Sequence, residues 1–160
     1  MARHLHFDCF SGISGDMTLG ALVDAGLPFK DLVRGLASLK IDGYRLTRKR
    51  VERGAITATK VDVLIDKGFR APLTLSQIAK ILRRSGLPPA VKERSQAVFD
   101  VLADAEGKAH GVEPSHVHFH EVGVIDSFVD VVGGILGLHL LDIRRVTASA
   151  INVGSGMLQS

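Results

Sequence analysis

Hydrophobic and polar positions recur along the first 40 residues with spacings that predict one strand followed by two helices. The opening residues alternate, which places Leu5 and Phe7 on one face of a predicted strand. Apolar residues at helical spacing then predict helices over 17–25 and 29–39, and Gly26 suits the end of the first helix.

Residues 44–66 change character and predict a β-hairpin. They alternate and are rich in Val, Ile and Thr, and the Arg53-Gly54 step between the two runs fits a turn. The basic run Arg48-Lys49-Arg50 lies on this hairpin. It is expected to form a solvated strand edge, because charges discourage edge pairing, and contact with a ligand phosphate is the alternative.

Two more helices are predicted after the hairpin. Thr74 and Gln77 have the spacing of a capping box, and the helix they begin should run to about residue 85. Pro88-Pro89 should open a longer helix that Gly111 ends. The apolar stripe of this longer helix is predicted to contain Val91, Ala97, Val98, Val101, Leu102 and Ala105.

The last third of the chain predicts a strand over 116–123, an apolar helix over 126–143 and a final strand over 144–156. The full order, β-α-α-β-β-α-α-β-α-β, favours the α/β (α+β) class. We therefore expect residues 1–160 to form a single domain with a mixed sheet flanked by helices.

Composition argues against several classes of protein. The 160 residues are 46% apolar and 23% charged, which is typical of a globular protein and argues against disorder or a fibrous repeat. The sequence contains no apolar run of about 18 residues, so no membrane span is predicted. No secretory signal is recognisable, and the single cysteine cannot form an internal disulfide. A cytoplasmic location is therefore expected. The net charge of +3, with dispersed basic residues and 5% aromatics, argues against nucleic acid as a partner.

Histidine is the unusual residue, since four of the seven lie between positions 110 and 120. In a strand, His116, His118 and His120 would share one face, and converging imidazoles are good ligands for Zn, Ni, Co or Cu. The alternative is an ordinary solvated face, opposite a buried face that carries Val117 and Phe119.

Carboxylates follow the histidines. Asp126 and Asp130 are spaced i, i+4 and should share a helix face within an apolar run. Asp126 is explained equally well as a helix cap, but a cap does not explain Asp130, which lies a turn further in. Glu121 would join only if the chain bends at Gly123. Imidazoles and carboxylates together predict a mixed metal site.

A Gly/Ser turn connects the first strand to the first helix over residues 8–16. In α/β proteins ligands bind at such carboxyl ends of strands, and glycines there expose backbone N–H groups to an anion. Asp8 and Asp16 are candidate catalytic residues, although Asp16 would also serve as a helix cap. The candidate substrate-binding residues are Ser11, Gly12, Ser14 and Gly15.

Four blocks of sequence resemble the LarC family, the nickel insertion proteins of nickel-pincer cofactor biosynthesis. They are FDCFSGISGDMTLGAL, RVERGAITATKVDV, AEGKAHG and VHFHEVGVIDSFVDVVG, in this order. The resemblance implies a lyase-type nickel chelatase that inserts Ni²⁺ into pyridinium-3,5-bisthiocarboxylic acid mononucleotide, for lactate racemase and related enzymes. Nickel becomes bonded to two sulfurs and one ring carbon.

The resemblance also implies cofactors and partners. The family reaction uses CTP with Mg²⁺ or Mn²⁺, and CTP binding belongs to the C-terminal domain of longer family members, which is expected to lie outside this chain. A homo-oligomer is expected. Because a nickel–carbon bond requires loss of a ring proton, Asp8, Asp16 or one of His118 and His120 is expected to act as the base, while the Gly/Ser turn holds the phosphate. Two rival functions remain open: a metal-dependent hydrolase of phosphate esters, and a non-catalytic metal carrier.

Overall fold

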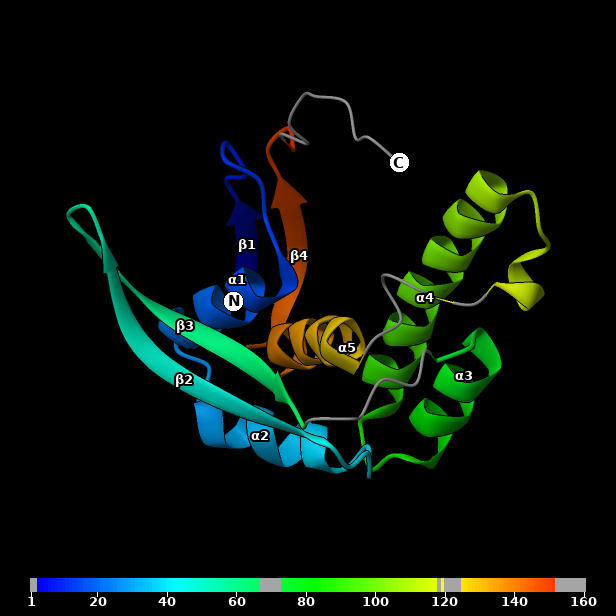
Figure 1. Cartoon of the computed structure of the whole chain (residues 1–160). Helices are drawn as coiled ribbons and strands as arrows, with labels where there is room; N and C mark the ends of the chain where they lie inside the picture. Colours follow the sequence, from blue (N-terminus) through cyan, green and yellow to red (C-terminus); the bar gives the residue numbers. More distant parts are fainter. Residues whose placement is uncertain (1–2, 67–72, 118, 120–124, 152–160) are drawn as a thin grey trace.

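Strands of both orientations are present, and they form two separate pairs among the residues described (Figure 1). In one pair, β1 (Arg3–Phe7) runs parallel to β4 (Ile143–Ala148). In the other, β2 (Tyr44–Arg53) and β3 (Ile56–Ile65) form an antiparallel hairpin whose tip extends away from the helices. The predicted α/β class is confirmed. The computed structural model describes residues 3–66, 73–117, 119 and 125–151.

Helices surround a central apolar helix, α5, which packs against α1, α2, α4, β3 and β4. It lies in the middle of the molecule in Figure 1, and its nearly all-round apolar sequence suits that position. No helix within the described ranges is long and apolar enough to cross a membrane. The helices are α1 (Gly15–Asp24), α2 (Phe29–Ala37), α3 (Leu75–Arg84), α4 (Pro89–His110), the short 3₁₀ helix η1 (Pro114–His116) and α5 (Ile125–Leu140).

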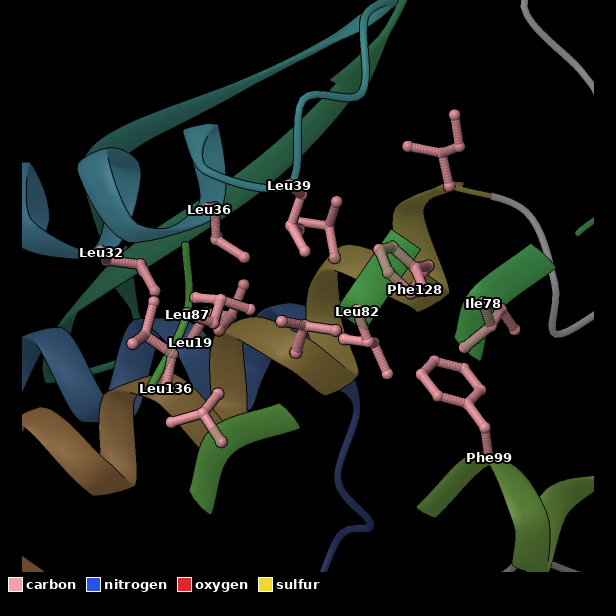
Figure 2. Close-up of a cluster of buried hydrophobic side chains, with 14 of the residues drawn as sticks. Leu19, Leu32, Leu36, Leu39, Ile78, Leu82, Leu87, Phe99, Phe128 and Leu136 are labelled. Carbon is pink, nitrogen blue, oxygen red and sulfur yellow. The ribbon is translucent and has the colours of Figure 1, made fainter. Parts of the chain in front are cut away.

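One hydrophobic core joins these helices, as Figure 2 shows for part of it. Leucines of α1, α2 and α5 meet on one side, and Leu82 and Ile78 of α3 lie toward the aromatic side chains of α4 and α5. The ring of Phe99 on α4 stacks on Phe128 of α5, with 5.5 Å between ring centroids. Burial of these large side chains holds α5 between the leucines of α1 and α2 on one side and the side chains of α3 and α4 on the other.

Several local signals in the sequence are confirmed. The hairpin turns at Gly54, whose φ of 60° is in the left-handed region that glycine adopts without strain. The Thr74 hydroxyl accepts the amide of Gln77 at 3.3 Å, and the Gln77 side chain accepts the amide of Thr74 at 2.8 Å, which completes the capping box. Gly111 ends α4 in the left-handed conformation.

The predicted apolar stripe of α4 is only partly confirmed: Val91 is buried and Leu102 packs against the core, but other members face solvent. Val101 is 68% exposed, and Ala97 and Ala105 are also exposed. Two positions of the buried face are occupied by Ser95 and Gly107, which carry no hydrophobic signal in the sequence. Their small size permits close packing, since a Cβ on Gly107 would lie 2.7 Å from the carbonyl oxygen of Val112. The buried face repeats every four residues and consists of Val91, Ser95, Phe99, Ala103 and Gly107.

The predicted strand over 116–123 is wrong at its start. Pro114 opens a turn of 3₁₀ helix, in which the amide of His116 donates to the Glu113 carbonyl at 2.8 Å. The fixed φ of proline suits this turn, which explains why the alternating sequence does not begin a strand here. Val117 and Phe119 are buried, as the pattern predicted. Residues 118 and 120–124 lie outside the described part of the chain.

Candidate functional site

The N-terminus of α1 meets the first turns of α5, and this junction contains two of the predicted site elements. Gly15, the first residue of α1, lies so close to Asp130 that a Cβ on Gly15 would overlap the aspartate side chain. Further along α5, a Cβ on Gly133 would lie 3.0 Å from the Leu19 side chain of α1, and one on Gly134 would lie 3.8 Å from Thr18. Glycine on both helices therefore brings the acidic face of α5 against the predicted Gly/Ser turn.

Asp130 is the most perturbed carboxyl group at this junction. Its Oδ1 atom is shielded from solvent and has no hydrogen-bond partner among the residues that the structure describes. Burial raises the pKa of Asp130 to about 6, with smaller contributions from the negative charges of Asp16 and Asp126. A carboxyl group in this state gains stability from a proton or from a bound cation, which is typical of functional sites.

Asp16 is held in position in the first turn of α1. Its carboxylate accepts a hydrogen bond from the hydroxyl of Ser14 and one from the amide of Met17 at 2.9 Å. Ser14, rather than Asp16, occupies the N-cap position. Opposite charge lies on β3: a hydrogen bond to Asp62 raises the pKa of Lys60, and the negative charges of Asp62 and Asp16 add to this effect.

The Gly/Ser turn connects β1 to this junction. Gly12 has a φ of 84°, and its amide donates to the carbonyl of Cys9 at 3.0 Å, so the chain reverses tightly there. The buried Cys9 donates its own amide to the hydroxyl of Ser149, just after β4, at 2.7 Å. Asp8 and Ser11 are exposed beside the turn. The turn is thus anchored to the sheet while its polar side chains remain accessible.

Sequence reasoning missed an apolar rim on the same segment. Phe10 is 78% exposed, Met17 is 55% exposed and Ile13 is 40% exposed. Exposed apolar side chains on one short segment beside a polar turn are typical of a surface that contacts a ligand or partner. Their spacing in the sequence fits a buried helix face as well, so only the fold reveals that they are exposed.

The predicted metal ligands are only partly tested by the structure. Asp126 and Asp130 lie in the first two turns of α5, and the exposed Asp126 accepts the amide of Ser127 at 2.8 Å, as a residue at a helix start does. His116 is exposed on η1. Among the described residues, no group of three or more His, Cys, Asp or Glu side chains is arranged to hold a metal ion. The remaining predicted ligands lie outside the described residues: His118, His120 and Glu121.

The basic run of the hairpin is exposed, as predicted, and lines a cavity of about 470 Å³ at the C-terminal end of α1. Arg50 forms an ion pair with Asp24 at 2.9 Å, and the guanidinium of Arg48 lies 5.2 Å from the centre of the Phe29 ring. Hydrogen bonds from the amide and the hydroxyl of Thr59 lower the pKa of Asp24, and Arg50 contributes further. These contacts attach α1, through Asp24, and α2, through Phe29, to the hairpin.

Comparison with known proteins gives a consistent result. A family model described as nickel insertion protein matches residues 5–160. A putative nickel insertion protein of Roseiflexus castenholzii is 46% identical over 160 residues, which are all of this chain and 40% of that protein. A pyridinium-3,5-bisthiocarboxylic acid mononucleotide nickel insertion protein of Desulfitobacterium hafniense is 48% identical over 155 residues, which are 97% of this chain and 38% of that protein.

The chain therefore spans about two fifths of the length of the curated relatives it matches. No solved structure matches it.

Proposed function

We propose, from the premise that the chain belongs to the nickel insertion protein family, that it forms the part of such a protein that presents nickel to its organic substrate. The proposed substrate is pyridinium-3,5-bisthiocarboxylic acid mononucleotide, after the name of the Desulfitobacterium hafniense relative. The observation that carries the proposal is the carboxyl group of Asp130, which is shielded at the junction of α1 and α5 and has no partner among the described residues.

Nickel is proposed to bind at the acidic start of α5. Asp126 and Asp130 supply carboxylate oxygens, and His118 and His120 supply imidazole nitrogens, with Glu121 as a further ligand. A mixed set of nitrogen and oxygen ligands holds a divalent ion and still permits its release, which a protein that hands nickel to a substrate requires. His116 is not retained as a ligand in this proposal, because η1 removes the strand geometry on which its prediction depended.

The base is proposed to come from the Gly/Ser turn. Formation of the nickel–carbon bond requires a ring C–H to lose its proton, so a carboxylate must accept that proton beside the metal. Asp16 fits this role better than Asp8, because two hydrogen bonds fix its carboxylate. The negative charge of Asp16 contributes to the raised pKa of Asp130, and the neighbouring Gly15 lies against Asp130, so the two carboxyl groups are proposed to act on one substrate.

The same turn is proposed to bind the remainder of the substrate. Ser11, Gly12, Ser14 and Gly15 are proposed to contact the anionic phosphate. The exposed Ser11 hydroxyl and the amides at the start of α1 are the proposed donors, because the Gly12 amide and the Ser14 hydroxyl already donate within the turn, and the start of α1 adds its positive dipole end. The rim of Phe10, Ile13 and Met17 offers apolar area to the aromatic ring. We further propose that the reaction is of the lyase type, uses CTP with Mg²⁺ or Mn²⁺ at the C-terminal domain of the family, and takes place in the cytoplasm.

The test is an equilibrium titration with Ni²⁺ of the untagged chain. We compare the unsubstituted protein with the His118→Ala/His120→Ala double variant and with Asp130→Asn. His139→Ala, on the exposed last turn of α5, is the matched control. The double variant should lose one equivalent of bound nickel, Asp130→Asn should bind it at least about tenfold more weakly, and the control should bind normally. Normal binding by the double variant would reject the proposed ligands.

A further inference from the structure

We propose that His4 and His6 of β1, together with Thr147 of β4, form a second, surface-exposed site for a divalent transition metal. The existence of this site does not depend on the function proposed above. Its role does: in a nickel-handling protein, a surface site of this kind serves as the first point of nickel capture.

Strand geometry brings the two imidazoles to one face. Along β1, the side chains of Leu5 and Phe7 are half-buried, whereas His4 and His6 are exposed on the opposite face. The parallel register pairs His6 with Thr147, so the threonine hydroxyl lies beside both rings. Two residues spaced i, i+2 on an exposed strand face thus point in the same direction without any special loop.

Hydrogen bonds show that the two rings converge. The Nε2 atom of His4 and the Nδ1 atom of His6 each lie 2.9 Å from the Oγ1 atom of Thr147. The two ring nitrogens are therefore no more than about 6 Å apart and face a common point. Both histidines are accessible to solvent, so an ion reaches that point without any opening of the fold.

The shared hydroxyl restricts how two neutral imidazole rings can bond to it. It has one hydrogen, so it donates to one imidazole nitrogen and accepts N–H from the other ring. One ring thus already directs a lone pair toward the shared point. Transfer of the N–H proton of the second ring to its other nitrogen is a change of tautomer without net loss of a proton, and it directs a second lone pair there.

Imidazole donors define the class of ion. Two nitrogen ligands suit Ni²⁺, Zn²⁺ and Cu²⁺ and do not suit Mg²⁺, which prefers oxygen. Water and the Thr147 hydroxyl remain as further ligands. Arg145 pairs with His4 in the register, and its positive charge opposes a bound cation. Binding is therefore expected to be exchangeable, which suits an ion that is captured and then passed on.

The position of the pair supports a role in capture. β1 leads from His6 directly into the Gly/Ser turn, and that turn ends at Gly15 and Asp16 of the candidate site. The proposed capture site at the start of this segment and the proposed nickel site at its end are therefore connected by one short stretch of chain.

The test uses the untagged chain and Ni²⁺ as the probe, with Mg²⁺ as the ion that should not bind. Calorimetric titration compares the unsubstituted protein with His4→Ala/His6→Ala, and His139→Ala is again the matched control. The double variant should lose one weak equivalent of nickel while the control retains it. Far-ultraviolet circular dichroism should be unchanged, because both side chains are exposed.

A second measurement assigns the site directly. Paramagnetic Ni²⁺ should broaden the imidazole resonances of His4 and His6 in NMR spectra of the unsubstituted protein and of the His118→Ala/His120→Ala variant. Equal nickel stoichiometry in the unsubstituted protein and His4→Ala/His6→Ala, or sharp His4 and His6 resonances at saturating nickel, would overturn the inference. Loss of binding only in His118→Ala/His120→Ala would support the function proposed above while rejecting this second site.

Discussion

Replacement of Asp130 by asparagine should stabilise the metal-free protein at neutral pH. The aspartate carboxyl lies against Gly15, its Oδ1 atom lacks a partner among the described residues, and Asp16 and Asp126 add negative charge nearby. Each of these features disfavours the charged form in the folded protein more than in the unfolded chain. Asparagine has almost the same shape and cannot ionise.

The magnitude follows from the pKa of Asp130, which is raised from 3.8 to about 6. A difference of this size corresponds to about 3 kcal/mol, which we reduce to about 1–2 kcal/mol because the side chain is only half-buried and solvent screens its charge. Because the pKa of the folded state is the higher one, the folded protein binds more protons between about pH 4 and pH 6. Stability is therefore highest below this window and is lost as the pH rises through it.

Urea unfolding in the presence of a metal chelator measures the effect. At about pH 7.5 the Asp130→Asn variant should be about 1–2 kcal/mol more stable than the unsubstituted protein, and at about pH 4.5 less than half of that difference should remain. Asp104→Asn, at an exposed position on α4, is the control and should show no such pH dependence. An Asp130→Asn variant that is equally stable or less stable at neutral pH would refute the argument.

Four further substitutions test the packing and capping of the fold by chemical denaturation. Gly20→Ala should destabilise the fold by about 1–3 kcal/mol, because the new Cβ overlaps the carbonyl oxygen of Thr59, whereas Gly134→Ala, with its nearest contact at 3.8 Å, should be neutral or stabilising. Asp24→Ala should cost about 1–2 kcal/mol at neutral pH; because the pKa of Asp24 is lowered in the fold, this cost should diminish as the pH falls below about 4. Thr74→Ala should cost about 1 kcal/mol through loss of the capping box, and a cost near zero would show that the cap is not formed.

Signals confined to a few neighbouring residues predicted the fold well. The capping box at Thr74, the hairpin turn at Gly54 and the helix end at Gly111 are each determined by the local chain, and all three are confirmed. Orientation of α4 was not predictable in the same way. Ser95 and Gly107 are buried because neighbouring segments pack closely there, and neither residue has a hydrophobic signal in the sequence.

At the candidate site, too, local features were predictable from the sequence and contacts between distant segments were not. Spacing within one helix predicted that Asp126 and Asp130 share a face, and the contribution of the Asp126 charge to the raised pKa of Asp130 agrees with this. The contact of Gly15 with Asp130 joins residues more than a hundred positions apart, so only tertiary packing reveals it. His4 was overlooked for a different reason: its alternation with Leu5 is visible in the sequence, but Thr147, which draws the two rings together, comes from a distant strand.

The central claim is that nickel binds where α1 meets α5. An anomalous difference map at the nickel absorption edge, from crystals of the chain soaked in Ni²⁺, tests it most directly. The proposal predicts a peak within bonding distance of a carboxylate oxygen of Asp130, with imidazole nitrogens of His118 and His120 among the other ligands. Nickel peaks confined to other parts of the molecule, with none at Asp130, would contradict it.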